Sequence, residues 1–185
     1  MYLCYWDGGI GKSTLVRQFI TKNRLEFDTI LYLHFKNSIQ NTIADDECLC
    51  VNTVEKTEEE SLEDYFRRKL ITIRKIIAGK TVIIVIDDFD GEIRDDLLSI
   101  LNAGWKVIII TRVRKHLTEY KEMDVGPLRE RRYQHCLFAK CMGQEFREEQ
   151  TVAIDKIINK VLGHTLTLEL IAKQIAKSYF TVEKA

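Results

Sequence analysis

The chain lacks several features that would assign it to particular classes of protein. It has one proline, Pro127, and no uninterrupted apolar run long enough to span a bilayer. Its 28 basic and 28 acidic side chains give a formal net charge of zero, which argues against a general polyanion-binding surface. We therefore expect no membrane contact and no nucleic-acid partner. Since no signal peptide is visible, the cytoplasm is the expected compartment.

Neither the histidines nor the cysteines form a recognisable metal site. The four histidines are scattered and make no H-E-x-x-H pattern. The five cysteines are odd in number, which fits reduced thiols in the cytosol. The pairs Cys48-x-Cys50 and Cys136-x₄-Cys141 match no common zinc spacing. We expect structural roles for these side chains.

A glycine-rich segment carries the clearest chemical signal. Residues 7–14 are D-G-G-I-G-K-S-T, between a short apolar run at 1–5 and a helical pattern at 15–22. Strand, glycine loop and helix are the context of a phosphate-binding loop. Glycines let backbone N–H groups turn inward around an anion, and the helix N-terminus adds donors. Trp6 stands where the pattern G-x-x-x-x-G-K-[ST] has its first glycine, and the remainder matches.

Each residue of this loop has an expected role toward ATP or ADP with Mg²⁺. Lys12 supplies a cation for the β- and γ-phosphates, Ser13 a hydroxyl for Mg²⁺, and Thr14 a second hydroxyl near the phosphates. The remaining loop residues are expected to bind the phosphates through their backbone: Gly8, Gly9, Ile10 and Gly11.

A second candidate site follows the apolar run at residues 82–86, which ends in Asp87-Asp88. Asp87 is expected to hold Mg²⁺ through water, and Asp88 to orient or deprotonate the attacking water. The alternative is a strand that simply ends in polar turn residues. The preceding phosphate loop favours the functional interpretation.

A third candidate site is Thr111-Arg112, at the end of the next apolar run. If this strand lies between the other two motif strands, both side chains point at the γ-phosphate. Thr111 would donate a hydrogen bond and Arg112 would bind the phosphate charge. The alternative is a threonine that caps a helix, followed by a surface arginine.

Alternating patterns predict an α/β fold with a five-stranded parallel sheet in three layers. Apolar runs as continuous as 82–86 are typical of parallel strands covered on both faces. Strands are expected at 1–5, 29–35, 82–86, 105–110 and 121–125, and helices at 15–22, from about Thr57 to Gly79, at 93–101 and at 113–120. The Thr57–Glu60 pair makes a capping-box pattern, and residues 37–56 have no assignable pattern.

The character of the chain changes after Pro127. No further strand is expected, and three helical patterns follow at about 129–142, 154–161 and 168–175, with Gly163 between the last two. We therefore predict a phosphate-loop nucleotide-binding domain at 1–126 and a small helical lid domain at 127–185.

Together these motifs resemble the nucleotide-binding domain of STAND-class ATPases, the NB-ARC family of plant resistance proteins and apoptotic activators. Residues 8–15 are similar to that family's G-G-[IV]-G-K-[ST]-T-L loop, 82–88 to its acidic strand, and 109–112 to its arginine-bearing sensor strand. Residues 128–139 resemble its L-F helix, and 163–168 its G-L-P-L-A-L motif, with Thr165 in place of the proline.

The resemblance implies a molecular switch in signalling or defence, with slow, weak Mg²⁺-dependent ATPase activity. ADP holds a closed state, and exchange for ATP drives ring assembly. In that family the segment at Thr165 and Leu166 faces the adenine. The resemblance also implies that this chain is the core of a larger protein, whose other domains and further copies are its partners.

Two other classes of function remain open. A small-molecule or nucleotide kinase would need a basic lid, for which residues 129–132 are candidates. The Asp87-Asp88 pair fits hydrolysis by water better than transfer to an acceptor. A DNA-acting ATPase of the replication-initiator type shares the same core and helical lid, and its DNA contacts could lie in another domain.

Overall fold

The computed structural model describes residues 2–45, 54–92, 104–113, 121–145 and 147–177. It divides into two compact units. The first contains Met1–Trp6 and Ser13–Asp124, and the second Asp7–Lys12 and Val125–Ala185. The helix expected at 93–101 lies outside the described residues, as does the helix expected at 113–120 apart from its first residue. The predicted domain boundary after residue 126 stays a prediction.

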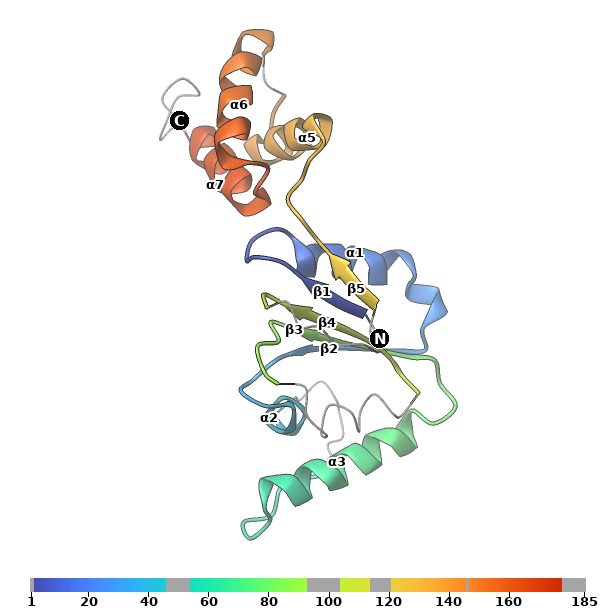
Figure 1. The fold of residues 1–185 in the computed structure, drawn as a ribbon. Coiled ribbons are helices and arrows are strands. Elements are labelled where there is room, and N and C mark those ends of the chain that lie inside the picture. Colours follow the sequence, from blue (N-terminus) through green and yellow to red (C-terminus); the bar gives the residue numbers. More distant parts are fainter. Residues whose placement is uncertain (1, 46–53, 93–103, 114–120, 146, 178–185) are drawn as a thin grey trace. The chain divides into compact units, whose positions relative to one another are not determined.

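The first unit is built on a five-stranded sheet in which every pair is parallel (Figure 1). Its strands are β1 (Tyr2–Tyr5), β2 (Thr29–His34), β3 (Val82–Asp87), β4 (Lys106–Thr111) and β5 (Lys121–Asp124). The order is β2-β3-β4-β1-β5. The predicted α/β fold with five parallel strands is confirmed. Because β4 lies between β1 and β3, the ends of the three motif-bearing strands meet at one edge of the sheet.

Helices cover both faces of this sheet. On one face lie α2 (Ile39–Ala44) and α3 (Leu62–Ile76), which pack on alternate strand residues. That core includes Leu3, Leu33, Ile84, Ile86 and Ile109 from the strands, and Phe66, Leu70 and Ile73 from α3. Burial of each such side chain contributes about 1.5–3 kcal/mol. On the other face, α1 (Lys12–Lys22) directs side chains to β2 and β3.

Strand β3 is buried at all six positions, as a central parallel strand covered on both faces should be. Strand β5 lies at the sheet edge and all four of its residues are exposed. This explains why β3 is a continuous apolar run and why the sequence pattern of β5 is weak.

The predicted start of α3 near Thr57 is wrong. The helix begins at Leu62, and its N-cap is Ser61, whose Oγ accepts a hydrogen bond of 3.1 Å from the Asp64 N–H. The Glu60 carboxylate does accept from the Thr57 N–H, at 3.4 Å, but the two residues form a turn ahead of the helix.

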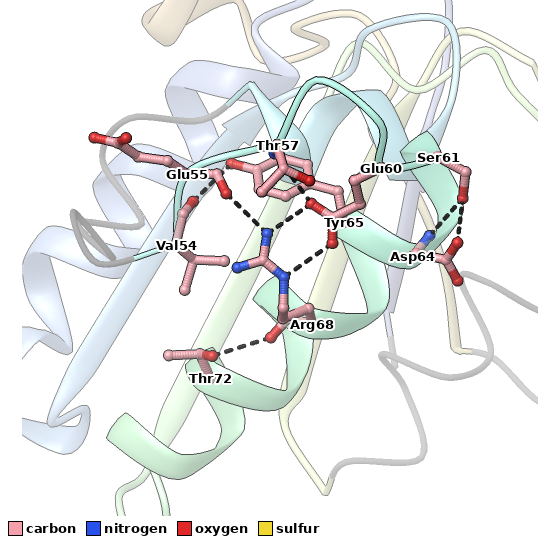
Figure 2. A network of polar contacts seen from close by, with 9 residues as sticks. All are labelled: Val54, Glu55, Thr57, Glu60, Ser61, Asp64, Tyr65, Arg68 and Thr72. Carbon is pink, nitrogen blue, oxygen red and sulfur yellow. Dashed lines mark hydrogen bonds and ion pairs between the residues drawn. The ribbon is translucent and has the colours of Figure 1, made fainter.

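Arg68 binds Glu60 and holds it in the turn ahead of the helix (Figure 2). Its Nε and Nη2 donate to the two carboxylate oxygens of Glu60 at 2.9 and 2.6 Å, and Nη2 also donates to the Glu55 carbonyl at 2.8 Å. This pairing lowers the pKa of the Glu60 carboxyl group. The Tyr65 hydroxyl donates to the Val54 carbonyl and so joins α3 to the segment that precedes this turn.

Over its described residues, the second unit has the three predicted helices: α5 (Arg131–Met142), α6 (Glu148–Val161) and α7 (Thr165–Ala176). One apolar cluster holds them together, and its fully buried members are Phe138, Ile154, Ile158, Leu168 and Ala172. No helix among the described residues has the length and apolar character needed to cross a membrane.

The turn between α6 and α7 depends on a glycine. Gly163 has φ +76°, and a Cβ at this position would lie 2.2 Å from the Leu128 carbonyl oxygen and 2.9 Å from Gln134 Nε2. The Leu128 N–H also donates to the Gly163 carbonyl at 3.1 Å. Backbone conformation and close approach therefore both require glycine here.

Gly163→Ala should lower the free energy of unfolding by about 2–4 kcal/mol, because it adds a steric clash to the strain of a positive φ. Gly143→Ala is the matched control. Gly143 has φ +75° with nothing within 4 Å of its would-be Cβ, so only the backbone cost of about 1–2 kcal/mol applies. Urea unfolding followed by circular dichroism measures both, and equal losses would contradict the steric explanation.

Candidate nucleotide-binding site

The acidic end of β3 is buried in the first unit, and both oxygens of its carboxylate accept hydrogen bonds. Asp87 is only 2% exposed. Its Oδ1 accepts from the Ser13 hydroxyl at 2.8 Å and from the Asp88 N–H at 3.0 Å. Its Oδ2 accepts from the Tyr32 hydroxyl at 2.6 Å. These donors compensate the cost of burying a carboxylate.

The structure thus brings together Ser13 and Asp87, the two predicted magnesium ligands. They come from the first turn of α1 and the last position of β3. Hydroxyl and carboxylate oxygens are the hard donors that Mg²⁺ prefers, with water and phosphate completing its shell. The donor set therefore fits the ion.

Tyr32 belongs to this site although the sequence analysis did not identify it. Burial, and next the hydrogen bond to Asp87, raise the pKa of Tyr32 to about 12, so the phenol stays protonated and donates at neutral pH. The Arg17 guanidinium lies over the phenol ring, 5.1 Å from its centroid. In the sequence, Tyr32 shows only the aromatic character of a strand residue. Its role becomes visible once β2 is placed beside β3.

Asp88 has a very different environment from Asp87. Its φ is +56°, a left-handed conformation that aspartate adopts more readily than most residues. Its side chain is 64% exposed and forms an ion pair of 3.3 Å with Arg112, itself 69% exposed. Such an exposed pair contributes about 0–1 kcal/mol, so either partner can exchange it for another contact. The two predicted catalytic residues lie together.

Thr111 ends β4 and is 1% exposed. Its Oγ1 accepts from the Val113 N–H at 3.1 Å, so the hydroxyl caps the turn that follows the strand. The Phe89 N–H donates to the Ile110 carbonyl at 2.8 Å and ties the segment after β3 to the end of β4. Contact between Thr111 and a phosphate stays a prediction.

The glycine loop, residues 7–12, is part of the second unit. Gly9 and Gly11 have positive φ values of 75° and 99°. The Lys12 ammonium donates to the Asp7 carbonyl at 2.8 Å, and the residue is 7% exposed. The Lys12 side chain therefore folds back over its own loop. Ile10 is also buried, whereas Gly8 and, on α1, Thr14 are exposed.

Three hydrogen bonds join this loop to the N-terminus of α7. His164 Nε2 contacts the Gly8 carbonyl at 2.9 Å. The Thr165 hydroxyl and the Leu166 N–H both donate to the Gly9 carbonyl, at 2.6 and 2.9 Å. Thr165 and Leu166 are thus in contact with the phosphate-loop segment, and their predicted contact with adenine stays untested.

The contacts of His164 define its tautomer. A carbonyl only accepts, so Nε2 carries the proton toward Gly8. Nδ1 then accepts from the Thr167 N–H at 3.3 Å, which caps α7, and from the Thr167 hydroxyl at 2.9 Å. The sequence analysis gave His164 no specific role, since its partner at Gly8 is 156 positions away.

Gly9 is required by this contact as well as by its φ. A Cβ on Gly9 would lie 2.8 Å from His164 Cε1 and 2.9 Å from Leu166 Cβ. Any other residue would push the N-terminus of α7 away from the loop.

No protein-family model and no curated protein matches this sequence. Among solved structures, AMPPCP-bound DnaA from Aquifex aeolicus is similar, with a TM-score of 0.57 and 16% identity over 98% of this chain and 56% of that chain. The chain has the fold of a P-loop ATPase. It spans little more than half of the DnaA chain.

Two further similar structures have lower scores. Drosophila ORC bound to AT-rich DNA and Cdc6 has a TM-score of 0.44 and 10% identity over 86% of this chain and 62% of that chain. The genome packaging NTPase B204 from Sulfolobus turreted icosahedral virus 2, in complex with ATP-gammaS, has a TM-score of 0.36 and 13% identity over 60% and 65%.

The finer expectations receive no support from these comparisons. The similarity to DnaA shows the fold alone, so the STAND or NB-ARC class and a role in apoptosis or defence stay predictions. The expectation that nucleic acid is not a partner also stays unsupported.

Thr165→Val should loosen the loop, because the Gly9 carbonyl loses one of its two donors. We expect amide hydrogen exchange at residues 8–12 to become about three- to tenfold faster, the effect of one neutral hydrogen bond. Thr72→Val is the control, since that hydroxyl donates to the Arg68 carbonyl within α3. Unchanged exchange in Thr165→Val would show that the contact does not hold the loop.

Proposed function

We propose that this P-loop ATPase fold binds ATP and ADP with Mg²⁺, hydrolyses ATP slowly, and serves as a nucleotide-dependent switch within a larger protein. The observation that carries the proposal is the 2.8 Å hydrogen bond between Ser13, directly after the glycine loop, and the buried Asp87. A glycine loop followed in the sequence by a hydroxyl that bonds to an acidic strand end is the pattern that Mg²⁺–nucleotide binding needs.

Each residue has a role in the proposed site. Lys12 would exchange the neutral Asp7 carbonyl for a charged phosphate, which is a stronger acceptor. Ser13 and Asp87 would hold Mg²⁺, which neutralises phosphate charge when bound. Asp88 would orient the attacking water, and Arg112 would leave Asp88 to bind the γ-phosphate.

The switch is supported by the hydrogen bonds between the loop and α7. His164, Thr165 and Leu166 bind the carbonyls of Gly8 and Gly9, so a loop that turns its N–H groups toward phosphate also moves the acceptors of these bonds. A ligand shifts such an equilibrium only through contacts that differ between the two states. A STAND-type switch, with assembly in the ATP state, is the finer form of this proposal.

A DNA-acting ATPase of the replication-initiator type is the second candidate, favoured by the similarity to DnaA. Retarded migration of labelled duplex DNA by the purified protein would favour it over the switch. The kinase alternative has less support, because the Asp87-Asp88 pair fits hydrolysis by water better than transfer to an acceptor. Its candidate lid arginines form exposed local pairs, Arg131 with Asp155 and Asn159 and Arg132 with Glu130.

Lys12→Ala should weaken ADP binding by roughly ten- to a hundredfold, because it removes a charge-assisted contact of about 1.5–3 kcal/mol. Isothermal titration calorimetry in the presence of Mg²⁺ measures the change. Lys22→Ala, at the exposed end of the same helix, is the control and should bind like the wild type. Equal affinities for wild type and Lys12→Ala would refute the assignment of the phosphate loop.

Asp87→Ala and Asp88→Asn should separate binding from turnover. Asp87→Ala should abolish the gain in ADP affinity that Mg²⁺ provides. Asp88→Asn should leave binding intact and slow phosphate release about a hundredfold or more, because only the water-orienting group is lost. If Asp88→Asn reduces nucleotide binding as severely as Asp87→Ala, the proposed division of labour is wrong.

A further inference from the structure

Four side chains of the first unit, those of Ser13, Asp87, Tyr32 and Arg17, are linked by successive contacts. Ser13 donates to Asp87 Oδ1 and Tyr32 donates to Asp87 Oδ2, while Arg17 covers the ring of Tyr32. Ser13 and Arg17 lie one helical turn apart on α1. These contacts join α1, β2 and β3.

The sheet register determines that Tyr32 reaches Asp87. In the parallel pair β2–β3, Tyr32 is opposite Val85 and His34 is opposite Asp87. Side chains two positions apart on a strand share a face, so Tyr32 and Asp87 lie on the face that α1 covers. The His34 ring lies 5.6 Å from that of Tyr32 and limits its movement along the strand.

The two oxygens of Asp87 are therefore not equivalent. Oδ1 has Ser13 and the Asp88 N–H as partners, and Oδ2 has the phenol. The terminal torsion of a free carboxylate has a broad energy profile, so an Asp87 without the phenol could rotate. Mg²⁺ and the waters that it keeps demand near-ideal octahedral geometry, which favours a carboxylate oxygen held in one place.

We propose that Tyr32 is a positioning residue for Mg²⁺ binding: it holds Asp87 Oδ2, so that Oδ1 stays beside Ser13, the other residue that would hold the ion. The inference rests on the proposed nucleotide-binding function and adds a residue to its metal site. The competing explanation is that the phenol only satisfies a buried carboxylate and stabilises the fold. The two explanations differ in whether removal of the phenol hydroxyl changes the Mg²⁺ dependence of ADP binding.

Tyr32→Phe tests the inference, because it keeps the ring beneath Arg17 and removes only the hydroxyl. ADP affinity is measured by calorimetry in Mg²⁺ and in EDTA, and Mn²⁺ binding to the ADP complex by electron paramagnetic resonance. We expect the increase in ADP affinity that Mg²⁺ provides to fall about tenfold or more, the effect of one hydrogen bond to a charged group. Affinity in EDTA should stay within about twofold of wild type, since Mg²⁺-free ADP does not use Asp87.

Tyr65→Phe is the matched control. Its hydroxyl is buried and donates to the Val54 carbonyl at 3.1 Å, away from Asp87. This variant should keep the wild-type gain from Mg²⁺ even if its stability drops. In the Asp87→Ala background, Tyr32→Phe should cause no further loss, because the two residues act through one contact.

Each other outcome has a defined meaning. If Mg²⁺ increases the ADP affinity of Tyr32→Phe as much as that of the wild type, the inference is overturned and the proposed function stands. An equal loss of ADP affinity in Mg²⁺ and in EDTA also overturns the inference, because it indicates a structural role. Additive losses in the double variant also overturn it. If the wild-type protein binds no ADP under either condition, the proposed function fails and the inference fails with it.

Discussion

The buried carboxylate of Asp87 is the group on which the arrangement of the first unit depends. A carboxylate removed from water has to be matched by donors, or it takes up a proton. Here the donors are the Ser13 and Tyr32 hydroxyls and the Asp88 N–H, from α1, β2 and the chain after β3. The same three hydrogen bonds therefore connect the helix after the glycine loop to two strands and fix the carboxylate that we propose to hold Mg²⁺.

The adjacent Asp88 shows how backbone conformation separates two identical side chains. Its left-handed φ turns it out of the strand direction, so it pairs with Arg112 in solvent while Asp87 remains buried. The Phe89 N–H then bonds to the end of β4, which stabilises this turn. Two consecutive aspartates thus occupy separate environments, as the separate roles proposed for them require.

Close backbone approach is the corresponding constraint in the second unit. Gly9 and Gly163 each lie where a Cβ would overlap a neighbouring residue, and both lie beside the start of α7. Through His164, Thr165 and Leu166 this helix contacts the carbonyls of the glycine loop. The loop is therefore linked to the helices by hydrogen bonds that depend on its conformation, as a switch requires.

The sequence by itself determined the parallel α/β fold, the three C-terminal helices and the glycine loop, because apolar periodicity and glycine spacing are local properties. It also placed Asp87 and Thr111 at the ends of strands. It did not determine the start of α3, where Arg68 engages Glu60 and leaves the cap to Ser61. Nor did it identify Tyr32 or His164, whose partners lie 55 and 156 positions away. Only the order of the strands and the packing of α7 bring those pairs together, since hydrogen bonds between residues so distant in sequence depend on the folded chain.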